Sequence, residues 1–234
     1  MKNQIDKPRC NCGIIGVFGH PEASLISYYG LHALQHRGQE AAGILSLEND
    51  KQKSHFNIHK GIGLVSEVFS DSNLFTSELN GNSAIGHNRY STTGASDSRK
   101  NIQPFHVNYR LGNLAIAHNG NLTNAKSLRE KLVDDGAIFQ TTSDTEVILH
   151  LIARSRQSEQ IDQIKEAISQ VQGAYSLVIL TNDKLIAARD SLGIRPLCIG
   201  KLNGSYIVTS ETCALDINSA SYIRDVVPGE IVVI

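Results

Sequence analysis

The chain is organised around residues 12–19, which read CGIIGVFG, a cysteine followed by a short apolar run. A run of this length, rich in β-branched side chains and closed by glycine, is typical of a buried strand. Cys12 stands at its head, after eleven residues that are mostly polar. A cysteine in an apolar strand is commonly a small buried hydrophobe, so this stretch alone leaves open whether Cys12 has a packing or a chemical role.

Removal of residues 1–11 would change the chemistry of Cys12. The segment has no hydrophobic periodicity and looks dispensable. Without it, Cys12 would carry a free α-amino group beside its thiol. The ordinary pKa of such an amine is about 8, against about 10.4 for lysine. The amine could therefore take a proton from the thiol near neutral pH, as it does for an N-terminal threonine nucleophile.

The composition excludes several classes of protein. The chain has 234 residues, of which 41% are hydrophobic, and a formal net charge of −1. That charge gives no electrostatic reason to expect nucleic acid or an anionic membrane as a partner. No apolar run is long enough for a membrane span or a signal peptide, so we expect a cytoplasmic protein. In such a chain the four cysteines do not indicate a disulfide framework.

Periodicity predicts strands in the first and last thirds of the chain and helices between them. The expected strands are residues 14–19, 41–46, 54–60, 83–90, 114–118, 174–180, 184–188, 197–200, 206–210 and 230–234. The expected helices begin at Pro21, at Leu122, behind Ser143 and at Gln160, and residues 71–82 read as a surface loop. Because hairpins rather than regular crossovers join the strands, the pattern favours an α+β fold with antiparallel sheets over a doubly wound parallel sheet.

Three shorter signals predict local geometry. Gly38 can end a helix in the left-handed conformation. Asn119-Gly120 reads as a turn between a strand and a helix, with backbone N–H groups pointing outward. Ser143 and Glu146 have the spacing of a capping box.

Polar or glycine-rich residues stand where buried elements end, in five places: residues 12–13, 36–40, 89–92, 118–121 and 143–144. Each has an ordinary explanation as a cap, a turn or a surface charge. Together they supply the parts of a thiol acyl-transfer site.

In that site Cys12 would be the nucleophile, and the Asn119 side chain and the Gly120 N–H would stabilise the oxyanion. Arg89 could hold a carboxylate and Asp144 an ammonium group. Glutamine carries a carboxylate, an ammonium group and a carboxamide, so the set of groups points to glutamine.

At residues 12–16, 29–40, 86–92, 117–122, 142–146, 190–197 and 210–214 the sequence resembles the glutaminase domain of the class II, or N-terminal-nucleophile, glutamine amidotransferases. Within that family it is most similar to the amidophosphoribosyltransferase branch. Glucosamine-6-phosphate synthase and asparagine synthetase are the near competitors. Residues 89–94 lack the tryptophan and the Thr-His-Gly expected of the hexosamine enzyme.

The resemblance implies a four-layer α/β/β/α sandwich, the N-terminal-nucleophile hydrolase fold, with two antiparallel sheets between helix layers. Residues 1–11 would be a propeptide and residues 12–234 the glutaminase domain, which hydrolyses glutamine to glutamate and ammonia. The implied catalytic residues are Cys12, Asn119 and Gly120. The implied substrate-binding residues are Arg89, Thr92, Asp144, Arg37 and Gly38.

The resemblance also implies partners. The ammonia would serve 5-phosphoribosylamine synthesis from phosphoribosylpyrophosphate, the first step of purine biosynthesis, in a phosphoribosyltransferase domain or chain that this sequence lacks. The chain would then be a truncation, an excised domain or half of a split enzyme. Full-length members are expected to form homo-oligomers.

Full-length members use magnesium, and some carry an iron–sulfur cluster whose ligands lie largely outside this region. We therefore expect no cofactor or metal in this domain, and Cys198 and Cys213 as buried hydrophobes. Two other interpretations stay open: a catalytically silent glutamine-binding module, and a structural metal site at Cys10, Cys12 and His20.

Overall fold

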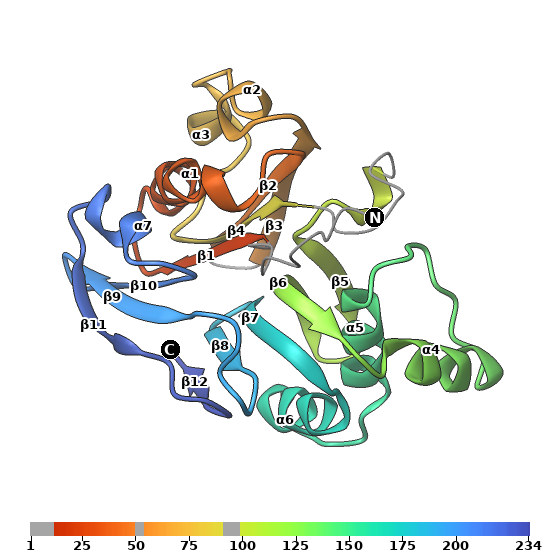
Figure 1. The fold of residues 1–234 in the computed structure, drawn as a ribbon. Coiled ribbons are helices and arrows are strands. Elements are labelled where there is room, and N and C mark those ends of the chain that lie inside the picture. Colours follow the sequence, from red (N-terminus) through yellow and green to blue (C-terminus); the bar gives the residue numbers. More distant parts are fainter. Residues whose placement is uncertain (1–11, 50–53, 91–98) are drawn as a thin grey trace, which may run out of the picture.

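The computed structural model describes residues 12–49, 54–90 and 99–234, which form two antiparallel sheets packed face to face between helices (Figure 1). Residues 1–11, and with them the expected propeptide, lie outside the described part. The strand order of the first sheet is β11-β9-β10-β1-β4-β2-β3, and that of the second is β12-β8-β7-β6-β5.

The first sheet consists of β1 (Gly13–Phe18), β2 (Ala41–Asn49), β3 (Ser54–Ile62), β4 (Ser83–Arg89), β9 (Cys198–Leu202), β10 (Ser205–Thr209) and β11 (Ser221–Asp225). The second consists of β5 (Phe105–Tyr109), β6 (Gly112–Leu122), β7 (Gly173–Thr181), β8 (Leu185–Arg189) and β12 (Ile231–Val233).

Helices cover the outer face of each sheet (Figure 1). Those over the first sheet are α1 (Ala23–Ala33), α2 (Val65–Val68), α3 (Leu74–Ser77) and α7 (Cys213–Asp216), with the 3-10 turn η1 (Gln35–Arg37) after α1. Those over the second sheet are α4 (Ala125–Asp134), α5 (Thr145–Arg154) and α6 (Gln160–Gln170). A second 3-10 turn, η2 (Arg99–Asn101), precedes β5. The four-layer α+β architecture expected from the sequence is confirmed.

The alternation of β1 explains why its sequence is apolar at every position. Ile14 faces the core between the two sheets, whereas Ile15 and Val17 face the core beneath α1. All three are fully buried, and each burial is worth about 1.5–3 kcal/mol. Gly16 lies where the two sheets approach closely, since a Cβ there would be 2.6 Å from Val178 Cγ1. The strand therefore belongs to two cores at once.

The structure corrects four local predictions. The first concerns β6, which continues through Leu122 in register with β7, so Asn119-Gly120 lies within a strand and not in a turn. The helix expected from Pro21 begins at Ala23, because the Ala23 N–H donates to the His20 carbonyl and closes a turn first.

Residues 71–82 include α3, and both Leu74 and Leu79 are buried, so this segment is not simply surface loop. The capping box is also absent. The Glu146 carboxylate accepts the N–H groups of Gln140 and Thr141 instead of that of Ser143.

The described helices are all too short or too polar to cross a lipid bilayer.

Candidate active site

Cys12 lies immediately before β1, where the strand is held on both sides. β4 and β10 flank β1, and Ser210 fixes its start: the Ile14 N–H donates to Ser210 Oγ at 3.1 Å, and the Ser210 N–H donates to the Ile14 carbonyl at 3.0 Å. Cys12 itself has φ +39°, in the left-handed region. Its carbonyl oxygen accepts a 2.8 Å hydrogen bond from Arg37 Nε.

The environment of the Cys12 thiol keeps it protonated. Burial raises its pKa above the ordinary value, and the positive charges of Arg89, Arg195 and Arg37 oppose that shift without overcoming it. The thiol lies 3.9 Å from the Tyr90 carbonyl oxygen. A thiol of this kind requires a base to become nucleophilic.

Asn119 is fully buried on β6, and neither its side-chain oxygen nor its nitrogen has a hydrogen-bond partner among the described residues. A buried amide without partners costs about 1–3 kcal/mol for each unsatisfied group. Such a group is accounted for when a ligand completes its hydrogen bonds.

Gly120 adds a backbone donor at the same place. Beyond Ile116, β6 has no partner from β5. On that edge the His118 N–H donates to Gln103 Oε1 at 2.8 Å, and the Leu122 N–H donates to Asp144 Oδ2 at 2.9 Å. Because N–H groups of alternate strand residues face the same edge, the Gly120 N–H faces it too.

Asp144 is ionised and firmly held at the start of α5. Burial opposes its ionisation, but His118 and the N–H groups of Leu122 and Thr145 outweigh burial and lower the pKa of Asp144 to about 2. Its Oδ1 lies 3.6 Å from His118 Nδ1, and 23% of the side chain is exposed. A carboxylate in this state can hold an ammonium group.

Two buried histidines connect the sheets behind these groups. His87 on β4 has no hydrogen-bond partner for either ring nitrogen among the described residues. Burial, together with the charges of His118 and Arg89, lowers the pKa of His87 to about 3, so it is neutral. Arg89 follows His87 on the same strand and makes no ion pair with any described residue. Electrostatic effects thus link neighbouring pairs of these groups: Arg89 acts on Cys12 and on His87, and His118 acts on His87 and on Asp144.

The comparison with protein families matches residues 87–216, more than half of the chain, to a glutamine amidotransferase domain. The chain belongs to the glutamine amidotransferase family.

Several members of the family are closely similar to this chain. Amidophosphoribosyltransferase 1 of Arabidopsis thaliana is 52% identical over 230 residues, which cover 98% of this chain and 40% of that protein. Amidophosphoribosyltransferase of Bacillus subtilis is 49% identical over 224 residues, covering 95% and 46%. The chain thus spans less than half the length of these curated relatives.

Solved structures agree with this assignment. The structure described as the allosteric regulatory enzyme of purine biosynthesis superposes with a TM-score of 0.89 at 49% identity, over 95% of this chain and 47% of the other. The glutamine phosphoribosylpyrophosphate amidotransferase from B. subtilis, complexed with ADP and GMP, gives a TM-score of 0.87 at 48% identity, over 95% and 47%.

The structure corrects the expected conformation of Gly38 and shows the local contacts of Arg37, two predicted site residues of this amidotransferase domain. Gly38 is extended, with φ −159° and ψ 127°, and not left-handed. Glycine is required there because a Cβ would lie 2.7 Å from the Arg89 carbonyl carbon. Arg37 is buried and directs Nε to the Cys12 backbone. Thr92, the remaining substrate-binding prediction, lies outside the described residues.

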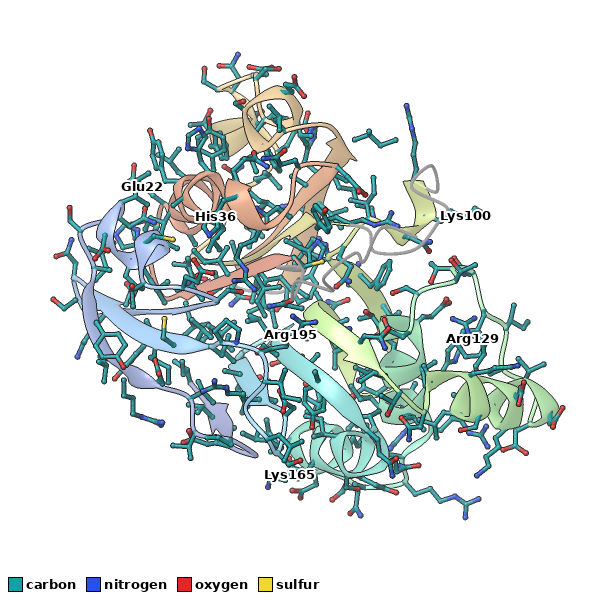
Figure 2. The ribbon with its side chains drawn as sticks, in the orientation of Figure 1. Glu22, His36, Lys100, Arg129, Lys165 and Arg195 are labelled. Carbon is teal, nitrogen blue, oxygen red and sulfur yellow. The ribbon has the colours of Figure 1, made fainter. Side chains whose placement is uncertain are left out.

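Sequence reasoning gave no role to two residues near Cys12. Arg195, in the loop after β8, exerts its charge on Cys12, and Figure 2 shows it near the middle of the molecule, between the sheets. Glu211, two residues after the end of β10, pairs with Arg37. Both lie in the segments that follow buried strands, Arg195 six residues after β8 and Glu211 two residues after β10, so a search for polar residues in such segments could have included them. Both also lie in stretches that carry the family resemblance.

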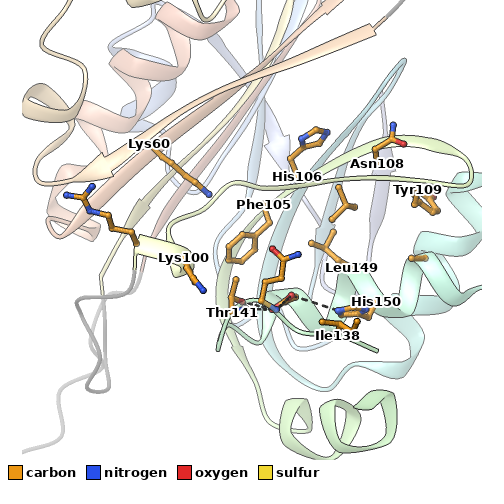
Figure 3. Close-up of a pocket in the computed structure, with 15 residues that line it drawn as sticks. Lys60, Lys100, Phe105, His106, Asn108, Tyr109, Ile138, Thr141, Leu149 and His150 are labelled. Carbon is orange, nitrogen blue, oxygen red and sulfur yellow. Dashed lines mark hydrogen bonds and ion pairs between the residues drawn. The ribbon is translucent and has the colours of Figure 1, made fainter. Parts of the chain in front are cut away.

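A cavity of about 650 Å³ lies away from these residues, between β5, α5 and η2 (Figure 3). Phe105 and Leu149 form its apolar wall, with Lys60 and Lys100 on one side. None of the predicted site residues that the structure describes lines it. The candidate active site is therefore distinct from this cavity.

Among the described residues, no group of three or more His, Cys, Asp or Glu side chains could hold a metal ion. Cys198 is buried, as expected, but Cys213 is half-buried beside Glu211. Cys10, proposed with Cys12 and His20 as metal ligands, lies outside the described residues.

Proposed function

We propose that residues 12–234 are the glutaminase domain of an amidophosphoribosyltransferase, and that residues 1–11 are a propeptide whose removal frees the Cys12 amine. The identity of about half to relatives of that name supports the assignment. The observation that carries the catalytic part is the Asn119 amide, which is fully buried and has no hydrogen-bond partner among the described residues. The next residue of β6, Gly120, offers a backbone N–H at the free edge of the strand. An amide in that state is suited to receive an oxyanion.

The proposed reaction begins when Cys12 Sγ attacks the carboxamide carbon of glutamine. The thiol proton passes to the α-amine of Cys12, and the negative charge moves to the carboxamide oxygen, where Asn119 Nδ2 and the Gly120 N–H stabilise it. When the tetrahedral intermediate collapses, the C–N bond breaks and the α-ammonium group gives its proton to the leaving nitrogen, which departs as ammonia.

Water then completes the cycle. It attacks the thioester carbon while the α-amine accepts one of its protons, and the same two donors hold the second oxyanion. The C–S bond breaks, the sulfur regains a proton from the α-ammonium group, and glutamate leaves. Because burial keeps the Cys12 thiol protonated, the reaction depends on this amine and not on a preformed thiolate.

Substrate recognition is assigned to charged groups at either end of the site. Arg89, without an ion pair among the described residues, would bind the α-carboxylate of glutamine, and ionised Asp144 would bind the α-ammonium group. Gly38 would allow the chain to pass close to Arg89, and Arg37 would hold the nucleophile. Thr92 would complete the substrate-binding set.

The ammonia would be used by a phosphoribosyltransferase domain or chain to make 5-phosphoribosylamine from phosphoribosylpyrophosphate. This part of the proposal comes from the relatives named amidophosphoribosyltransferase, of which this chain spans less than half. A homo-oligomeric assembly, magnesium, an iron–sulfur cluster in some members and a cytoplasmic location belong to the same proposal. Within the described residues no gathered side chains would hold the metals.

The test is a glutaminase assay with mass spectrometry of the N-terminus. Protein that starts at Cys12 should release glutamate from glutamine, and Cys12→Ala should abolish that release while still binding glutamine in calorimetry. Cys198→Ala is the matched control, since it makes the same change at a buried cysteine of the β9 core. Turnover by Cys12→Ala would refute the mechanism. Binding without turnover in correctly processed wild-type protein would favour the silent binding module.

A further inference from the structure

Glu211 is joined to the nucleophile through one intervening side chain. Its Oε1 accepts a hydrogen bond from an Arg37 terminal nitrogen, and its Oε2 lies 2.9 Å from His36 Nε2. On its other side, the Arg37 guanidinium donates from Nε to the Cys12 carbonyl oxygen at 2.8 Å. The guanidinium is planar, so fixing one end of it also fixes the direction of the other.

The Arg37–Glu211 pair is well placed to act as a rigid support. The Arg37 side chain is only 5% exposed and that of Glu211 33% exposed. Burial opposes the ionisation of Glu211, but the contacts with Arg37 and His36 outweigh burial and hold its pKa below the ordinary value. Glu211 is therefore charged at neutral pH, as a buried guanidinium requires of its partner.

The position of Glu211 follows from strand pairing. β10 pairs with β1, and Ser210 exchanges hydrogen bonds with Ile14. The next residue, Glu211, is thereby brought to the end of β1 where Cys12 lies. A carboxylate at this point can support the first residue of the mature chain from the neighbouring strand.

Cys12 needs such support once residues 1–11 are removed, because only its carbonyl side is then bonded to the chain. The φ of +39° that Cys12 has in the uncleaved chain depends on its bond to the preceding residue, so cleavage releases that constraint. After removal of residues 1–11, nothing precedes Cys12. The hydrogen bond to its carbonyl group is then the backbone contact that orients the residue. The direction of the thiol and of the amine both depend on that orientation.

We infer that Glu211 is a positioning residue for the N-terminal nucleophile, which it orients by aiming the Arg37 guanidinium at the Cys12 carbonyl. This inference rests on the proposed glutaminase function. It predicts that loss of Glu211 impairs the chemical step and leaves glutamine binding almost intact, because Arg89 and Asp144 are untouched.

The test uses Glu211→Gln in the full chain, with turnover expressed per site titrated by a glutamine analogue that alkylates the thiol. We expect kcat to fall about 10- to 100-fold, the loss typical of a small misplacement of a reacting group, while KM changes less than about twofold. Glu230→Gln is the matched control, since it makes the same substitution in an arginine–glutamate pair near the C-terminal strand. It should leave kcat unchanged.

A double-variant cycle separates positioning from general stability. If Glu211 acts through Arg37, then Glu211→Gln added to Arg37→Gln should lower kcat by less than about twofold further. If the falls in kcat of the two single variants multiply in the double variant, the inference is overturned. A wild-type kcat in Glu211→Gln, or a rise in its KM as large as the fall in its kcat, would overturn it as well.

Two further results keep the outcome clear. If Glu211→Gln does not fold, Glu211→Asp serves instead. The shorter carboxylate keeps the charge but draws Arg37 away from the Cys12 carbonyl, so kcat per titrated site should fall with KM unchanged, and wild-type kcat would refute the inference. Wild-type protein without any glutaminase activity would instead refute the proposed function itself.

Discussion

Asp144 should make the stability of the protein depend on pH in a defined window. Its pKa is about 2 in the folded chain, against an ordinary value of 3.8 for an aspartate. A carboxyl group whose pKa is lower in the folded state stabilises the fold above the unfolded pKa and loses that contribution as pH falls through the folded pKa. The difference corresponds to about 2 kcal/mol in total, of which about 1 kcal/mol is lost by pH 3.

Asp144→Asn removes this contribution and so provides the test. The free energies of unfolding of wild-type and variant protein would be measured by urea titration at pH 6 and pH 3. The destabilisation caused by the substitution should be about 1 kcal/mol smaller at pH 3 than at pH 6. At pH 3 the Asp144 carboxyl group of the unfolded wild-type chain is mostly protonated, and this protonation stabilises the unfolded state relative to the folded one.

A matched control distinguishes this effect from a general consequence of removing a carboxylate. Asp135→Asn makes the same change in a surface pair with Arg154, in which both side chains are about half exposed. Such a pair contributes about 0.5 kcal/mol or less, so its loss should be small at both pH values. If Asp144→Asn destabilised the protein equally at pH 6 and pH 3, the account of the Asp144 carboxylate given above would be wrong.

The remaining predictions concern the site. Asn119→Ala should lower kcat about 100- to 1000-fold, because it removes an oxyanion donor. It should not lower the free energy of unfolding, because it also removes a buried amide that has no partner among the described residues. An unchanged kcat would show that Asn119 is not an oxyanion donor. Arg89→Lys should raise KM for glutamine about tenfold, because it replaces a bidentate contact with the substrate carboxylate by a point charge. An effect on kcat alone would count against carboxylate binding by Arg89. Gly120→Ala should destabilise the chain in urea by about 2 kcal/mol or more, since its Cβ would lie 2.0 Å from the Ala174 carbonyl oxygen. Gly136→Ala, at another positive φ but with nothing within 4 Å, should cost clearly less, and equal losses would contradict the steric argument.

The layers of the fold were predictable because local pattern and tertiary packing agree. β1 is apolar on both faces, and both faces are used. The pairing of β2 with β3, and of β7 with β8, follows from apolar strand segments separated by short polar stretches of sequence. In these elements the apolar pattern within about ten residues of sequence agrees with the pattern of burial in the folded protein.

The errors arise where distant pairing overrides local signals. Asn119-Gly120 has turn chemistry, but β7 continues alongside β6 and keeps the pair in a strand. β11 was missed because all five of its residues are exposed, which leaves no apolar alternation to detect. α7 is only four residues long, too short for a helical period.

The members of the candidate site follow from the sequence more readily than their arrangement does. Cys12, Arg89 and Asp144 were proposed as site residues because polar groups at the ends of buried elements are conspicuous. The contact of Glu211 with Arg37 joins residues 174 positions apart and depends on β10 lying beside β1. A single sequence carries no direct signal that β10 lies beside β1. The same is true of His87 and His118, which meet only because the two sheets stack.

The central place of β1 has a consequence for the end of the processed chain. Termini are ordinarily the most disordered part of a domain. Here the first residue would be tethered at once, because β1 is bonded along both edges from Gly13 or Ile15 onward and Arg37 holds the Cys12 carbonyl. A chain end that cannot fray has little conformational freedom left to lose during turnover. Cleavage would therefore produce a Cys12 α-amine that is already held in the orientation needed for catalysis.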